Sequence, residues 1–204
     1  TSTSTQSQAE ILMVAGFSGM GKTAVINEVH KPITRQHGYF IEGKCDQFNR
    51  DIPLSAFVQA LENLIAQLLS ESDEQLSQWR CKILDALGEN SQVLLDVIPD
   101  LGKIIGPQPA APVLSGPAAQ NRFNHLFQKF IAVFATSAHP LVLFLDDLQW
   151  ADSAALQLIQ QLMEDTQHLL LLCAYRDNEV SPVHPLMLTM DALIADNTLV
   201  STIT

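Results

Sequence analysis

The stretch ILMVAGFSGMGKT, residues 11–23, decides the fold of this chain. Its first five residues form a continuous apolar run that ends on Gly16, as a strand buried on both faces of a sheet does. The next eight residues, 16–23, match the phosphate-binding loop pattern G-x-x-x-x-G-K-[ST] at every position. A helix is expected over residues 22–30, because Pro32 would stop it. The sequence therefore predicts a strand, a phosphate-binding loop and a helix in succession.

The residue types of this loop suit a bound triphosphate. Glycines let successive N–H groups point at phosphate oxygens, and the start of the following helix adds its positive dipole end. Lys22 is expected to reach the β- and γ-phosphates, and the Thr23 hydroxyl is expected to bind Mg²⁺. The expected nucleotide contacts are Gly16, Ser18, Gly19, Met20, Gly21, Lys22, Thr23 and Ala24. The alternative is an ordinary glycine-rich turn, although a chance match in a chain of this length is on the order of one in a hundred.

Apolar runs and helical periodicities alternate along the rest of the chain. Further strands are expected over residues 39–43, 141–145, 169–174 and 199–203. Helices are expected over residues 54–69, 74–87, 123–134, 154–164 and 186–194, while 93–98 is ambiguous. Residues 102–117 contain three glycines and four prolines and are expected to form a loop. The pattern predicts an α/β fold with a mostly parallel five-stranded sheet, covered on both faces, and a helical insertion between the second and third strands.

A pair of carboxylates follows the apolar run at residues 141–145. Asp146 and Asp147 would lie at the carboxyl end of a buried strand, where α/β sheets bind their ligands. We expect Asp146 to hold Mg²⁺, usually through water, and Asp147 to polarise an attacking water. The alternative is a turn or a helix cap, which is the commoner role of such a pair when no phosphate-binding loop precedes it.

Composition narrows the class of protein. The 204 residues suit one large domain, and 11 Lys and Arg against 22 Asp and Glu give a net charge of −11. This field repels nucleic acid and anionic lipid, and no apolar run reaches the 18 or more residues that span a bilayer. Three separate cysteines favour a reducing compartment, hence the cytoplasm, and six histidines show no metal-ligand spacing. We expect residues 1–9 to be a disordered lead-in or linker and residues 10–204 to be a domain cut from a longer protein.

The string LDDLQWAD, residues 145–152, together with GFSGMGKT, resembles the nucleotide-binding domain of the signal-transduction ATPases with numerous domains, a branch close to the AAA+ ATPases. The resemblance covers residues 10–204. Residues 31–48 and 174–186 resemble in particular the ATPase domains of large bacterial signalling proteins. Those proteins carry a serine/threonine kinase domain before this region and sensor and histidine-kinase modules after it.

This resemblance implies several further features. It implies ATP as the nucleotide, a P-loop NTPase core with strand order 5-1-4-3-2, and no helical lid within this chain. It assigns hydrolysis to Asp147 and makes Arg176 the sensor of the γ-phosphate, which a guanidinium can bond bidentately. The alternative for Arg176 is a strand-end arginine paired with Asp177 or Glu179.

Nearby residues have simpler interpretations. Asp152 is expected to cap a helix while Trp150 packs, although both are distinctive of the resemblance. Gln149 could orient the attacking water or be a polar residue at the start of a helix. Arg122 is expected to be solvated, with a role near the nucleotide as the alternative.

Three functions are compatible with these residues. The first is a switch domain that binds ATP and Mg²⁺ and hydrolyses ATP slowly, and whose conformational change acts on neighbouring kinase and sensor domains. A homo-oligomer is a further expected assembly. The second is a module that holds nucleotide without turnover. The third is a small-molecule kinase, but only two arginines, Arg122 and Arg176, follow Lys103 to form a lid. Protein-kinase motifs are absent, so such activity would belong to another domain.

Overall fold

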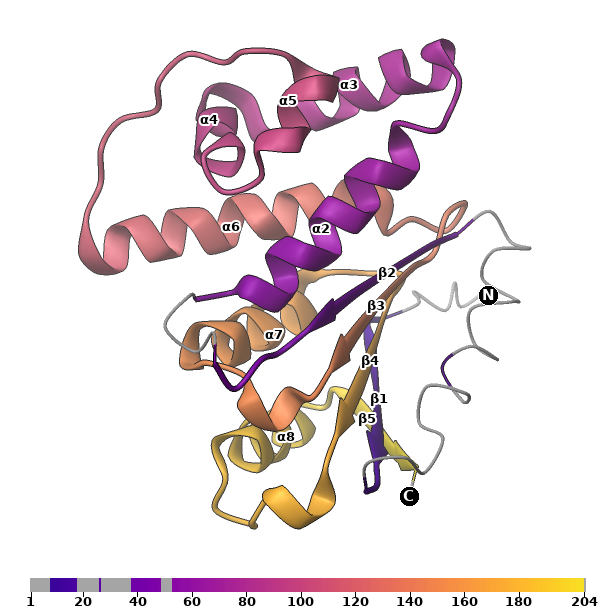
Figure 1. Ribbon diagram of the computed structural model, residues 1–204, viewed down its shortest axis with the longest axis vertical. Coiled ribbons are helices and arrows are strands. Elements are labelled where there is room, and N and C mark those ends of the chain that lie inside the picture. Colours follow the sequence, from indigo (N-terminus) through magenta and orange to yellow (C-terminus); the bar gives the residue numbers. More distant parts are fainter. Residues whose placement is uncertain (1–7, 18–25, 27–37, 49–52, 204) are drawn as a thin grey trace, which may run out of the picture.

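The computed structural model describes residues 8–17, 26, 38–48 and 53–203. Five strands form one sheet with every pairing parallel: β1 (Glu10–Ala15), β2 (Tyr39–Lys44), β3 (Leu141–Asp146), β4 (Leu169–Tyr175) and β5 (Leu199–Ile203). Their order, β2-β3-β4-β1-β5, is the predicted order 5-1-4-3-2 read from the other edge (Figure 1). The architecture is the α/β fold of the P-loop NTPases, as predicted.

The central strand β3 shows why the apolar runs predicted a sheet covered on both faces. Leu141, Leu143 and Leu145 belong to the main core, whereas the alternate residues Val142 and Phe144 belong to a second cluster. Side chains of a strand alternate between its two faces, so both faces of β3 are buried. Ile26, the described residue of the helix expected over 22–30, is helical and lies in the second cluster.

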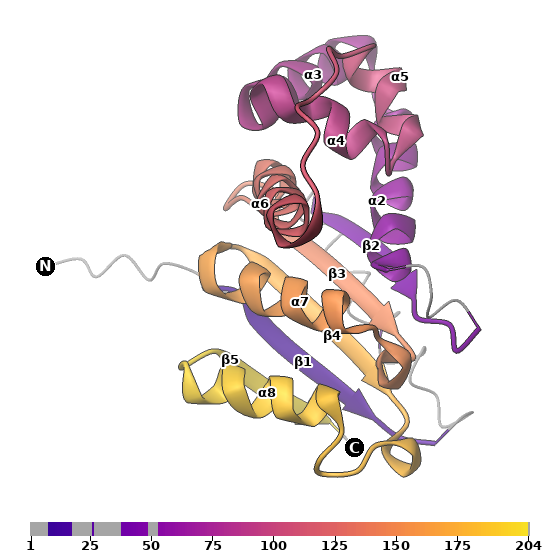
Figure 2. The same ribbon diagram turned by 90° about the vertical axis from the view of Figure 1, so that its left-hand side faces the viewer.

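Among the described helices, α6 (Gly116–Phe134), α7 (Ser153–Asp165) and α8 (Pro185–Ala195) lie on the main-core face of the sheet (Figure 2), and the first helix of the insertion packs against the same face of β2. The helices α6, α7 and α8 each contain a predicted helix. The isolated bridge between Gln8 and Gln167 and the burial of Ala9 extend the placed chain two residues before the expected start at Glu10.

The predicted helical insertion between β2 and β3 lies beyond the edge strand β2 (Figure 1). It contains α2 (Ser55–Leu68), α3 (Asp73–Leu87), α4 (Ser91–Leu95), α5 (Gly102–Ile105), and the 3₁₀ turns η1 (Gly88–Asn90) and η2 (Pro99–Leu101). The prediction of one loop over residues 102–117 was wrong at both ends. Gly106, with φ of 73°, follows α5, and Pro117 stands in the first turn of α6. Glycine and proline here mark helix ends, as they commonly do.

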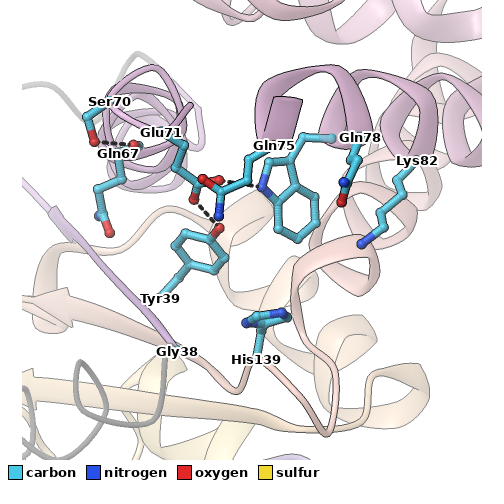
Figure 3. Close-up of a pocket in the computed structure, with 10 residues that line it drawn as sticks. Gly38, Tyr39, Gln67, Ser70, Glu71, Gln75, Gln78, Lys82 and His139 are labelled. Atoms are coloured by element: carbon cyan, nitrogen blue, oxygen red, sulfur yellow. Dashed lines mark hydrogen bonds between the residues drawn. The ribbon is translucent and has the colours of Figure 1, made fainter. Parts of the chain in front are cut away.

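The insertion is fastened to the amino end of β2 through Glu71. One carboxylate oxygen accepts a 2.6 Å bond from the Tyr39 hydroxyl and the other accepts a 2.9 Å bond from the Trp79 indole (Figure 3). Burial, followed by the bond to Glu71, raises the pKa of Tyr39. These groups line a cavity of about 410 Å³ with His139 and Lys82, whose ammonium lies 4.4 Å from the Trp79 ring centroid. Tyr39 begins β2 and Lys44 ends it, so the cavity lies at the amino end of the strand, away from Lys44.

The carboxyl end of β2 is packed against α2 so closely that only glycine fits. A Cβ atom built on Gly43 would lie 1.8 Å from the carbonyl oxygen of Ala56, the second residue of α2. In addition, the Lys44 N–H donates a 2.7 Å hydrogen bond to the Gln59 side-chain oxygen. The end of β2 is therefore held by direct contact with the helical insertion.

We expect Gly43→Ala to lower the free energy of unfolding by about 1–3 kcal/mol or more, because the methyl group would displace α2 from β2. Urea unfolding followed by circular dichroism measures this. Gly102→Ala is the matched control, since its added Cβ would meet only Leu95 Cδ2 at 3.5 Å in a helix. Equal stability of the Gly43 variant and the wild-type chain would contradict the close packing.

Candidate functional site

Parallel pairing brings the carboxyl ends of four strands to one edge of the sheet. Lys44 at the end of β2 is paired with Asp146 at the end of β3. Ala15 at the end of β1 is paired with Tyr175 at the end of β4, so Gly16 and Arg176 follow paired residues. Residues far apart in sequence thus meet at the edge where α/β sheets bind ligands.

The chain turns sharply after β3. Asp147 has φ of 53° and ψ of 43°, a left-handed conformation that Asp adopts more readily than most residues. Its N–H donates a 2.9 Å bond to Asp146 Oδ1, and its carbonyl accepts a 3.0 Å bond from the Trp150 N–H. The 3₁₀ turn η3 (Leu148–Trp150) follows directly. This turn leaves Asp147 5% exposed, while the Asp146 side chain is 30% exposed.

Both carboxylate oxygens of Asp147 have partners. Oδ1 accepts a 3.0 Å bond from Gln149 Nε2 and lies 3.2 Å from Arg176 Nε. Oδ2 lies 3.1 Å from Lys44 Nζ. Burial by itself raises the pKa of Asp147, but the bonds from Gln149 and Lys44 and the charges of Lys44 and Arg176 outweigh it. The net result is a pKa below its ordinary value, so the carboxylate is held in its charged form.

Arg176 is held from several sides. Its guanidinium bonds Glu179 at 2.9 Å, pairs with Asp147, and lies 4.9 Å from the Trp150 ring centroid. Its backbone N–H donates a 3.2 Å bond to Gln149 Oε1. The hydrogen bond that its guanidinium donates to Glu179 is the largest cause of the raised pKa of Arg176. The pairing with Glu179, which was the alternative for Arg176, is therefore present together with a contact to Asp147 that places Arg176 beside the acidic pair.

The structure adds two residues that the sequence analysis did not assign to the site. Lys44 was missed because only its pairing with Asp146, which the sequence does not record, brings it to the site. Gln149 is 4% exposed and uses its amide to connect the Asp147 carboxylate with the Arg176 backbone. The burial of Gln149 is the feature that identifies it as part of the site, and this burial depends on the left-handed turn at Asp147.

The structure also places three other residues that the sequence singled out, Asp152, Trp150 and Arg122. Asp152 caps α7, as predicted, with a 2.9 Å bond from the Ala155 N–H, and it also accepts a 3.0 Å bond from the Leu54 N–H. Trp150 packs against the main core and against Arg176. Arg122 bonds the Pro112 carbonyl oxygen, next to the insertion.

Part of the phosphate-binding loop is described. Gly16 has φ of 150°, a conformation that L side chains rarely adopt, and so it needs glycine. Phe17 is 54% exposed. The expected contacts Ser18, Gly19, Met20, Gly21, Lys22, Thr23 and Ala24 lie outside the described residues.

The described residues fit a hard cation bound together with a phosphate. Carboxylate oxygens are the ligands that Mg²⁺ prefers, and it is often held by one or two of them plus substrate phosphates. Asp146 supplies such oxygens at the edge where Gly16 opens the loop. Among the described residues, no group of three or more His, Cys, Asp or Glu could hold a metal ion.

None of the described helices is long and apolar enough to cross a membrane.

The P-loop fold and this edge define a nucleotide-binding domain related to the AAA ATPases. Residues 2–173 match the family described as the AAA ATPase domain, and the chain belongs to that family. It is 43% identical over 155 residues to hybrid signal transduction histidine kinase G of Dictyostelium discoideum, and 22% identical over 171 residues to histidine protein kinase 1 of Candida albicans. Each match covers 76% of this chain but only 4% and 7%, respectively, of those much longer proteins.

We expect Gln149→Leu to raise the pKa of Asp147, because burial remains while the largest compensating bond is lost. A carboxylate with a lowered folded-state pKa stabilises the fold above its unfolded pKa and loses that contribution as pH falls through the folded pKa. Acid destabilisation of the variant should therefore begin at higher pH, with about 1–3 kcal/mol lost near neutral pH.

Carboxyl ¹³C NMR titration of Asp147 and urea unfolding at several pH values measure these effects. Gln92→Leu is the matched control, because it removes a 2.7 Å bond to Asp96 on an exposed surface. An unchanged titration of Asp147 would show that Gln149 does not hold its charge.

Proposed function

We propose that this chain binds ATP with Mg²⁺ and hydrolyses ATP slowly, as a nucleotide-dependent switch within a multi-domain signalling protein. One observation carries the proposal: Gly16, the Asp146–Asp147 pair and Arg176 stand at the same edge of a P-loop sheet. A phosphate-binding loop, two carboxylates and an arginine are the groups that phosphoryl-transfer sites need. Membership of the AAA ATPase domain family supports nucleotide as the ligand.

Each residue has a distinct proposed role. Main-chain N–H groups of the loop, from Gly16 to Ala24, would bind the phosphates, and Lys22 would neutralise their charge. Thr23 and Asp146 would hold Mg²⁺, which when bound offsets negative charge on the phosphate oxygens. Arg176 would bond the γ-phosphate and lose that bond on hydrolysis, which changes the edge of the sheet.

Asp147 is the proposed group that polarises the attacking water. Gln149, Arg176 and Lys44 bond its two oxygens, and these bonds leave the carboxylate poorly placed to accept a proton. Turnover then requires at least one of these partners to move. This requirement supports slow hydrolysis and a switch over fast catalysis.

The names of the relatives support the signalling context. Both are histidine kinases, and the chain corresponds to a small part of each. We propose that neighbouring kinase and sensor domains of the same protein respond to the nucleotide state, and that self-association accompanies it. Free Cys45, Cys81 and Cys173 support a cytoplasmic location.

The second candidate is a domain that holds nucleotide without turnover. The observation that favours it is the same set of bonds to Asp147, provided that they persist when nucleotide is bound. Phosphate release from a protein extended at both ends separates the two candidates, since only the first predicts it.

We expect Lys22→Ala to weaken ATP binding by at least about tenfold, because the β- and γ-phosphates lose their cation. Calorimetric titration of the 204-residue chain with ATP and GTP, with and without Mg²⁺, measures this. Lys103→Ala is the control, since that exposed lysine pairs with Asp100 on the insertion. An unchanged dissociation constant for the Lys22 variant would contradict the phosphate-binding loop.

We expect Asp147→Asn to retain ATP binding but to lower the hydrolysis rate by about 100-fold or more, because an amide cannot accept the proton of water. The assay uses the protein extended at both ends, with phosphate release and ATP titration measured on the same sample. Asp100→Asn serves as the control carboxylate. Hydrolysis by the Asp147 variant at the wild-type rate would leave Asp147 with a structural role alone.

A further inference from the structure

Lys44 places a positive charge between the two carboxylates of the acidic pair. Its ammonium nitrogen lies 3.1 Å from Asp147 Oδ2 and 3.8 Å from Asp146 Oδ2. The parallel register fixes this arrangement, because Lys44 and Asp146 are paired residues of neighbouring strands. The ammonium contacts the carboxylate that Mg²⁺ is expected to use.

The two described cations beside the pair differ in how firmly they are held. The Arg176 side chain is 27% exposed and is fixed by Asp147, Glu179 and the Trp150 ring. The Lys44 side chain is 58% exposed, and among the described residues its ammonium pairs with the two carboxylates alone. A lysine side chain is long and flexible, so its ammonium can move into solvent without disturbing the fold. Lys44 is the exchangeable cation of the two.

We propose that Lys44 is a tethered counter-ion that occupies the place of the divalent cation when nucleotide is absent and leaves when Mg²⁺ binds with nucleotide. Two adjacent carboxylates in an acidic chain need a positive charge nearby, and an ammonium and Mg²⁺ repel each other strongly at such short range. Lys44 therefore suppresses metal binding to the nucleotide-free site. The proposal rests on the proposed Mg²⁺–nucleotide site and names how that site is regulated.

Mn²⁺ binding to the nucleotide-free 204-residue chain tests this directly. Electron spin resonance measures free Mn²⁺, and Mg²⁺ competition reports whether the two ions share the site. We expect Lys44→Gln to bind Mn²⁺ about tenfold more tightly than the wild-type chain, while Lys44→Arg, which keeps the charge, binds it as weakly as the wild type. Adding Asp146→Asn to Lys44→Gln should remove the gain.

Lys103→Gln is the matched control, because its side chain is 60% exposed and also pairs with an aspartate. It should leave Mn²⁺ affinity unchanged. Equal affinities of the Lys44→Gln and wild-type chains would overturn the proposal, as would a gain that survives Asp146→Asn.

A second measurement uses the wild-type chain and needs no variant to fold. An amine-acylating reagent followed by mass spectrometry reports the reactivity of each lysine. Reactivity of Lys44 should rise at least threefold when Mg²⁺ and ATP are added together, while that of Lys103 stays constant. Unchanged or reduced reactivity of Lys44 would contradict its release. The Mn²⁺ titration needs no nucleotide. A failure of the role proposed for Lys44 can therefore be told apart from a failure of the chain to bind ATP.

Discussion

The parallel pairing of β2 with β3 is the constraint on which the site depends. It sets Lys44 opposite Asp146 and fixes which residues reach the carboxyl edge of the sheet. Side chains alternate along a strand, so a shift of one residue would turn every side chain of β2 to the other face. Ile41 would then leave the main core, in which it is fully buried. The hydrophobic core and the charge pairing of the site are therefore specified by the same register.

Burial of Asp147 gives this edge its electrostatic organisation. A buried carboxylate is costly unless hydrogen bonds and opposite charges compensate for it. Gln149, Arg176 and Lys44 supply that compensation from three different segments of the chain. The same bonds that make the folded site stable also restrain the carboxylate chemically. The bonds that stabilise Asp147 in the nucleotide-free fold therefore work against its proposed role in hydrolysis.

Much of the fold could be predicted from the sequence, and less of the site. Apolar runs located β1, β3 and β4 because a buried parallel strand has a distinct composition. The strand β5 was also predicted, although its residues are largely exposed. The strand order came from the family resemblance, since no local pattern records which strands are neighbours. Lys44 was missed because a lysine at a strand end becomes significant only once its pairing partner is known. Gln149 was ambiguous because its burial depends on the left-handed turn at Asp147. Glycines and prolines over residues 102–117 suggested a loop but also marked the ends of α5 and α6.

The helical insertion is coupled to the site by its first helix. Gly43 touches Ala56, Lys44 donates its N–H to Gln59, and Leu54 donates its N–H to Asp152. Asp152 also caps α7, which follows the acidic pair along the chain. A displacement of α2 must therefore alter the end of β2 or the start of α7, because packed elements transmit strain. The insertion is in turn fastened to the opposite end of β2 through Glu71. Strand β2 thus connects the insertion with the acidic pair, and a shift of the Lys44 backbone, unlike a movement of its side chain, would alter the contact with Gln59 of α2.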